Sequence, residues 1–250
     1  MGNACSQPSD DQDIEVDHKR KSPKGKGKYG PSSGGVIKYH GGIFSHVKGE
    51  VEQTRQKHGD YDFSGNDFEP EDYDVIEIAK NHYYQGEYDD TRQKPIGCGI
   101  EVFPDGSLYE GENGGPGRLI KANGDMYEGE FDNNKADGEG TYITKDGQKY
   151  VGSWSKDKKQ GKGVETWPDG ARYEGDYKEG NWHGKGEYTL ADNSNYKGYF
   201  KNGEICGKGK YKWADGDTYN GEWKDSKMHG KGVFKWKDGK TYEGDFQRGI

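Results

Sequence analysis

From Tyr84 onward, apolar and polar positions alternate in short runs separated by glycine-containing turns. Tyrosines recur at intervals of 23 residues: Tyr127, Tyr150, Tyr173, Tyr196, Tyr219 and Tyr242. Counting each tyrosine as position 1, position 3 is always glycine, position 5 is aromatic, and positions 12 and 14 carry glycine pairs. Side chains two residues apart share one face of a strand. Each unit therefore predicts two strands with one face lined by glycine and aromatic residues.

The predicted aromatic face consists of positions 1 and 5 of successive units. These are Tyr127, Phe131, Tyr150, Trp154, Tyr173, Tyr177, Tyr196, Phe200, Tyr219, Trp223, Tyr242 and Phe246. We expect the glycines to clear space where large rings from neighbouring strands lie across the backbone. Lysine, glutamate and aspartate occupy the alternate positions and are expected to face water.

Turn residues recur with the same period. Positions 20 and 21 read Asp-Gly in four units, which indicates tight hairpins. The exception is Asp192-Asn193, where asparagine is the next residue best able to accept a positive φ. A second turn falls near positions 7 and 8, as in Asn202-Gly203. The sequence therefore predicts an all-β, elongated, single-layer antiparallel meander.

The first units are irregular but keep the pattern. The interval from Tyr84 to Tyr109 is two residues longer than 23, and that from Tyr109 to Tyr127 is five shorter. The shortening falls at the first turn, where Asn113-Gly114 is itself a two-residue turn signal. Length changes confined to loops are tolerated by a hairpin array.

The stretch "YNGEWKDSKMHGKGVFKWKDGK" (219–240) closely resembles the MORN repeat family, and the likeness extends over about 84–250. The resemblance implies an elongated, twisted, single-layer sheet. The family includes junctional membrane proteins, plant phosphoinositide kinases, ciliary radial spoke proteins and protist cytoskeletal scaffolds. It implies a scaffolding or docking surface, and the repeat itself is not an enzyme.

Composition limits the chemistry. Hydrophobic residues make up 28% of the chain, too few for a large core, but 13% are aromatic, enough for a thin one. The net charge of −8 argues against a general nucleic-acid binder. Three cysteines far apart do not suggest a disulfide framework. We find no nucleophile motif or phosphate-binding loop, and expect no enzymatic activity, cofactor or metal. His183, Cys206 and His229 share position 11, but the spacing of repeats keeps them too far apart for one ion.

The chain divides into three parts. We expect residues 1–35 to form a disordered tail, residues 36–83 an irregular cap, and residues 84–250 an array of about seven units, the last one partial. Phe44, Val47 and Val51 are spaced as one helical face, and an apolar cluster lies at 75–79; a helix or a strand is compatible with each. Strand 241–246 is expected to form an open edge that pairs with a second copy or another protein, or else a frayed terminal strand.

The N-terminus matches the myristoylation motif M-G-x-x-x-[ST] as Met1-Gly2-Asn3-Ala4-Cys5-Ser6. One myristoyl chain binds membranes only marginally, so stable anchoring needs a second signal. Palmitoylation of Cys5 is one candidate. The other is a basic cluster that would attract an anionic leaflet: Lys19, Arg20, Lys21, Lys24, Lys26 and Lys28.

The sequence thus predicts a non-enzymatic scaffold anchored to the cytoplasmic face of a plasma or ciliary membrane by Gly2 and Cys5. Protein partners would dock on the aromatic face or the open end. One alternative is a structural component of a ciliary axoneme or another cytoskeletal assembly. Another is a regulatory subunit of a lipid kinase.

Overall fold

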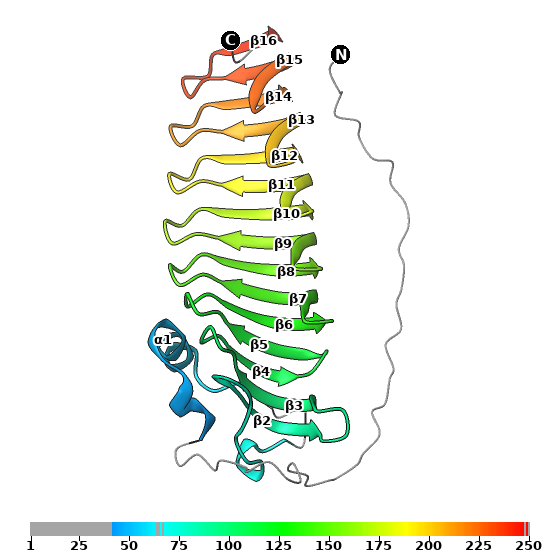
Figure 1. Ribbon diagram of the computed structural model, residues 1–250. Helices are drawn as coiled ribbons and strands as arrows, with labels where there is room; N and C mark the ends of the chain where they lie inside the picture. Colours follow the sequence, from blue (N-terminus) through cyan, green and yellow to red (C-terminus); the bar gives the residue numbers. More distant parts are fainter. Residues whose placement is uncertain (1–41, 64–65, 67, 248, 250) are drawn as a thin grey trace.

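The computed structural model describes residues 42–63, 66, 68–247 and 249, and most of them belong to one antiparallel sheet (Figure 1). The helical elements are η1 (Ile43–His46), α1 (Gly49–His58) and η2 (Pro70–Asp72). The strands of the first half are β1 (Ile76–Ala79), β2 (His82–Asp89), β3 (Lys94–Val102), β4 (Leu108–Glu112), β5 (Pro116–Ile120), β6 (Met126–Asp132), β7 (Lys135–Ile143) and β8 (Lys149–Ser155). Those of the second half are β9 (Lys158–Thr166), β10 (Arg172–Lys178), β11 (Asn181–Thr189), β12 (Asn195–Lys201), β13 (Glu204–Lys212), β14 (Thr218–Lys224), β15 (Lys227–Lys235) and β16 (Thr241–Phe246).

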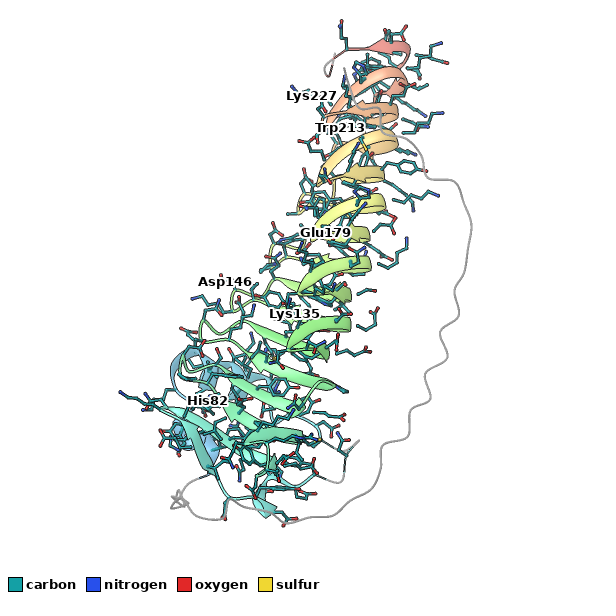
Figure 2. All side chains as sticks on the ribbon, turned by 45° about the vertical axis from the view of Figure 1, so that its right-hand side comes forward. His82, Lys135, Asp146, Glu179, Trp213 and Lys227 are labelled. Carbon is teal, nitrogen blue, oxygen red and sulfur yellow. The ribbon has the colours of Figure 1, made fainter. Side chains whose placement is uncertain are left out.

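Strand order in the sheet follows strand order in the sequence, so the 16 strands form an open meander. The predicted all-β, single-layer architecture is confirmed. Figure 2 shows the sheet turned by 45° as one twisted layer with side chains projecting on both sides. We call the face that carries the position-1 tyrosines the aromatic face, and the opposite face the back face.

A row of glycines crosses the sheet at right angles to the strands. One glycine of each strand from β2 to β16 is paired with the glycine of the next strand, in the order Gly86, Gly99, Gly111, Gly117, Gly129, Gly140, Gly152, Gly163, Gly175, Gly186, Gly198, Gly209, Gly221, Gly232 and Gly244. These are positions 3 and 14 of the repeat. We call this row the glycine ladder.

The glycines at position 12 have a different cause. Gly184 has a φ of 59° and lies where the pairing of β10 with β11 shifts register, between Gly175 and Asp176. An L-residue with a side chain adopts this backbone conformation only with strain. Position 12 is thus glycine because of a bulge, and position 14 because of the aromatic ring above it.

Turns are present at both predicted places, but Asn202-Gly203 forms a two-residue hairpin, whereas Asp146-Gly147 does not. At positions 7 and 8, Asn202 and Gly203 both have positive φ, 53° and 85°, as a type I′ hairpin requires. At positions 20 and 21, Asp146-Gly147 occupies the last two places of a four-residue turn, since Gly147 N donates to Thr144 O at 2.9 Å. Asn193 takes a φ of 65° where the other units have glycine, as expected from the sequence.

The segment before β2 lies on the back face of the first strands. β1 pairs with β2 and extends the sheet by one strand, while α1 contacts β5, and Thr54 Oγ1 donates to Gly124 O at 3.0 Å (Figure 1). Ile43, Val47 and Val51 are buried there, together with apolar side chains of the back face: Ile100, Val102, Leu108, Ile120 and Met126. This segment therefore supplies a second core, on the side of the sheet opposite the tyrosines.

Candidate docking surfaces

Each unit begins with a tyrosine whose ring lies flat over the glycine ladder. A Cβ added to Gly186 would lie 2.5 Å from Tyr173 Oη, and a Cβ added to Gly175 would lie equally close to that oxygen. The hydroxyl of each such tyrosine donates to the carbonyl oxygen three residues later, over 2.7 to 3.4 Å, for Tyr84, Tyr109, Tyr127, Tyr150, Tyr173, Tyr196, Tyr219 and Tyr242. The glycines therefore make room for the rings, as predicted, and the hydroxyls fix the rings in place.

The position-5 rings join one unit to the next. Tyr177 meets Tyr173 of its own unit edge-to-face at 5.3 Å and Tyr150 of the preceding unit at 5.0 Å. The same two contacts recur for Phe131, Trp154, Phe200, Trp223 and Phe246. We call this continuous row of position-1 and position-5 rings the aromatic spine.

Most of the predicted aromatic face is buried within the array. Tyr127, Tyr150, Tyr173, Tyr177, Tyr196, Phe200, Tyr219, Trp223 and Phe246 are at most 8% exposed, and Phe131 and Trp154 are partly buried. Tyr242, in the last strand of the sheet, is 45% exposed. These rings therefore form the core of a sheet only one layer thick, and among them Tyr242 offers the largest surface to a partner.

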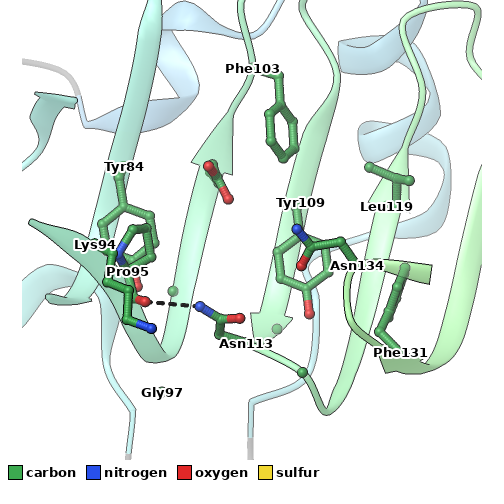
Figure 3. Close-up of a pocket in the computed structure, with 14 residues that line it drawn as sticks. Tyr84, Lys94, Pro95, Gly97, Phe103, Tyr109, Asn113, Leu119, Phe131 and Asn134 are labelled. Atoms are coloured by element: carbon green, nitrogen blue, oxygen red, sulfur yellow. Dashed lines mark hydrogen bonds between the residues drawn. The ribbon is translucent and has the colours of Figure 1, made fainter. Parts of the chain in front are cut away.

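The aromatic spine is interrupted once. Asn113 takes the position-5 place in the short unit, because its N–H donates to Gly97 O as that of Phe131 donates to Gly115 O. Its side chain turns to Pro95 O, 2.9 Å away, and leaves a cavity of about 350 Å³ between Tyr84 and Tyr109 (Figure 3). We call this cavity the spine slot. Tyr109 is partly exposed, whereas Tyr127 in the next unit is 3% exposed.

One charged pair lies inside the spine. Lys159 and Glu165 stand at positions 10 and 16, where other units carry mostly apolar residues such as Trp182 and Tyr188. Glu165 is 5% exposed and accepts hydrogen bonds from Lys159, from Gln148 at 2.7 Å, and from Tyr177 at 3.0 Å. Burial raises the pKa of Glu165, but these donors outweigh it and the pKa is lowered overall.

A second charged pair is buried under the N-terminal segment. Arg118 donates to Glu110 Oε2 at 2.9 and 2.7 Å, and the two side chains are 2% and 1% exposed. Burial raises the pKa of Glu110, although Arg118 opposes the rise. Burial also raises the pKa of the Cys98 thiol to about 11, so this thiol is protonated at neutral pH.

The back face of the later strands is uncovered and hollowed. A depression of about 770 Å³ runs along the glycine ladder from β7 to β12, and another of about 600 Å³ lies over β13 to β16. Charges of both signs flank the first, including Lys162, Glu174, Lys185, Glu187 and Lys197. This surface is accessible to a partner.

Several predicted residues lie outside the part of the chain that the structure describes: Gly2, Cys5, Lys19, Arg20, Lys21, Lys24, Lys26 and Lys28. None of the helices in the described part is long and apolar enough to span a bilayer. His183, Cys206 and His229 face Asp176, Tyr199 and Glu222 on the paired strands. Within residues 42–63 and 68–247, no group of three or more metal-binding side chains comes together.

Sequence reasoning missed the spine slot and the pair formed by Lys159 and Glu165. Both had a signal, because Asn113, Lys159 and Glu165 interrupt columns that are aromatic or apolar in most other units. The buried pair of Glu110 and Arg118 had no such signal. Its burial depends on a segment whose position on the sheet the sequence does not specify.

Comparison with known proteins gives a family and some distant folds. The TCP domain of Drosophila melanogaster SAS-4 (dCPAP), solved with a proline-rich motif of Ana2 (dSTIL), is 14% identical over 60% of this chain and 85% of that chain, with a TM-score of 0.39. The TCP10c domain of Drosophila melanogaster Sas-4 is 14% identical over 60% and 93%, with a TM-score of 0.36. No function is transferred from likenesses this distant, and no curated protein matches.

The MORN repeat model matches residues 127–149, 150–172, 173–195, 196–218 and 219–241. The matched frame begins each unit at the tyrosine that lies over the glycine ladder. Residues 127–241 of this chain are therefore five consecutive MORN repeats.

Proposed function

We propose that this chain is a non-enzymatic docking scaffold, held to the cytoplasmic face of a membrane by acyl chains on Gly2 and Cys5. The observation that carries the docking part is the uncovered back face of β8–β16. On the cross-strand row that begins at Ile100, exposure rises from 1% at Ile100 to 42% at Val151. The depressions beside this row offer charges of both signs, which favours a partner protein with complementary charges.

The membrane part rests on the sequence of the tail. Residues 84–250 contain 26 lysines and arginines against 30 aspartates and glutamates, a net charge of −4. The array thus supplies little attraction to an anionic leaflet, whereas each basic residue of the tail contributes about 1 kcal/mol near one. Acylation at Gly2, reinforced by Cys5 and the basic cluster, would supply the two signals that stable anchoring needs.

Fractionation of cells that express the full chain tests the anchor. We expect Gly2→Ala to move the protein into the soluble fraction and Cys5→Ser to weaken its membrane attachment. An unchanged membrane fraction for Gly2→Ala would refute the acyl anchor.

Co-purification tests the docking surface separately. Proteins that co-purify with the wild type should be lost from a Glu174→Lys/Glu187→Lys variant, because the substitutions reverse charges beside the depression. Asp146→Lys, in an exposed turn, is the matched control and should retain them. Retention by the double variant would exclude this face as the docking surface.

A further inference from the structure

We propose that the spine slot binds an aromatic side chain presented by a partner polypeptide. The slot would be one of the contacts of the scaffold proposed above. The inference rests on that proposed function in one respect, that the bound residue belongs to a docked partner. It concerns the aromatic face of β2–β5, whereas the charged depressions lie on the back face of later strands.

The other units show what fits this place. Between Tyr150 and Tyr173, the ring of Tyr177 meets both tyrosines edge-to-face, at 82° and 89°. Between Tyr196 and Tyr219, the ring of Trp223 does the same at 82° and 83°. Each successive pair of position-1 tyrosines from Tyr109 to Tyr242 is bridged in this way. Tyr84 and Tyr109 are not, because Asn113 has no ring.

The slot has the same kinds of residue around it as the places that hold a ring in the other units. Its floor includes Gly97, Gly99 and Gly111, and its walls include Tyr84 and Tyr109 (Figure 3). Phe103 and Leu119 close further sides. The volume of about 350 Å³ lies at the small end of the range for ligand pockets. These surfaces match one ring rather than a large ligand.

The mouth of the slot is polar. Lys94, Asn113 and Asn134 line it and are exposed to solvent. The interior is walled mainly by aromatic and aliphatic side chains, but it also includes Glu101, whose carboxylate is hydrogen-bonded to His82 at 2.6 Å. Mostly apolar walls with a few placed polar groups are typical of ligand pockets. The amide and ammonium groups at the mouth can bond the backbone on either side of the bound residue.

Small probes added to the full chain test the preference for a ring. We would titrate N-acetyl-phenylalaninamide and its saturated analogue N-acetyl-cyclohexylalaninamide while recording leucine methyl resonances. The methyl groups of Leu119 should shift saturably, and those of Leu190, in a distant turn, should not. Edge-to-face contacts favour the aromatic probe, so it should bind about 5-fold more tightly than the saturated one.

Filling the slot from within provides the second test. Asn113→Phe should restore the missing ring, raise Tm and abolish the response of Leu119. Asn113→Leu is a second filling variant with the same expected loss. Asn181→Phe adds a ring at an exposed position away from the slot and should bind the probe as the wild type does.

Three outcomes would overturn the proposal: no saturable shift of Leu119 in the wild type, equal affinity for the two probes, or an undiminished response in a folded filling variant. In the first of these cases, a shift that appears once Tyr29 and Tyr39, the two tyrosines of residues 1–41, are replaced by alanine would identify this chain's own tail as the occupant. Membrane fractionation of Gly2→Ala is independent of all these results, so failure of the anchor and failure of the slot are distinguishable.

Discussion

The covered half of the sheet (β2–β7) and the uncovered half (β8–β16) carry the same glycine ladder but differ in what lies on the back face. In β3–β7, the back-face row Val102, Leu108, Ile120, Met126 and Ile143 is apolar and packs beneath the N-terminal segment. In β8–β10, the same row continues as Lys149, Thr166 and Arg172 and faces solvent. The sheet therefore has two cores at one end and one core along the rest.

The difference coincides with the break in the aromatic spine. The covered half contains both units of irregular length and the place where Asn113 replaces a ring. The regular units need no cover, because rings lying over glycine bury themselves against the backbone of their own sheet. Where the spine is incomplete, the sheet also has a second core on its back face.

Removing a spine ring from the uncovered half should have the largest effect. Tyr173 is fully buried, bonds Asp176 O and meets Tyr177, Trp182 and Phe200. Tyr173→Ala should lower the free energy of unfolding by about 3–5 kcal/mol. Denaturant unfolding measures this, with the exposed Tyr242→Ala as the control, expected to cost about 1 kcal/mol or less. Equal effects of the two changes would mean that the spine is not the core of this half.

Breaking the buried ion pair should destabilise the covered half by about 3 kcal/mol. Arg118→Met leaves Glu110 buried without its counter-charge. The matched variant Arg172→Met removes an exposed pair with Glu174 on the back face of the other half and should cost about 0.5 kcal/mol or less. Hydrogen exchange should show the loss of protection confined to β2–β7. Equal loss in β12–β16 would contradict the division into two halves.

Breaking the charged pair that packs against the spine should lower the free energy of unfolding by about 2 kcal/mol. Glu165→Gln deprives Lys159 of its counter-charge, whereas Lys159→Met/Glu165→Tyr restores the residue types of other units and should be neutral or stabilising. Folding lowers the pKa of Glu165 below its ordinary value of 4.5, so its contribution is present above that pH and is lost as the pH falls further. From pH 7 to pH 3, the free energy of unfolding should therefore fall less steeply for the double variant than for the wild type. Identical pH dependence in the two proteins would exclude this role.

The sequence predicted the regular half well because its columns record backbone requirements. Each regular unit carries a glycine beneath a ring and a turn residue at positive φ, which is glycine in the other units and Asn193 in one. The sequence could not predict which surface the segment before β1 covers, because its few apolar side chains do not identify the residues that they contact. The apolar residues at Leu108, Ile120 and Met126 were a partial signal, since later units carry polar residues in that row.

The smallest predicted effect concerns a turn whose residues do not suit its backbone conformation. Lys156 and Asp157 form the turn between β8 and β9 with φ of 50° and 67°, a conformation that lysine adopts only with strain. Lys156→Asn/Asp157→Gly supplies the preferred pair of a type I′ turn and should raise the free energy of unfolding by about 1 kcal/mol, even though the Ala136 N–H loses its acceptor, Asp157 Oδ1. The reciprocal change at Asn202-Gly203, to Lys-Asp, should lower it by a similar amount. If both variants unfolded like the wild type, turn strain would contribute nothing to the stability of this half, and ring packing alone would hold its hairpins in register.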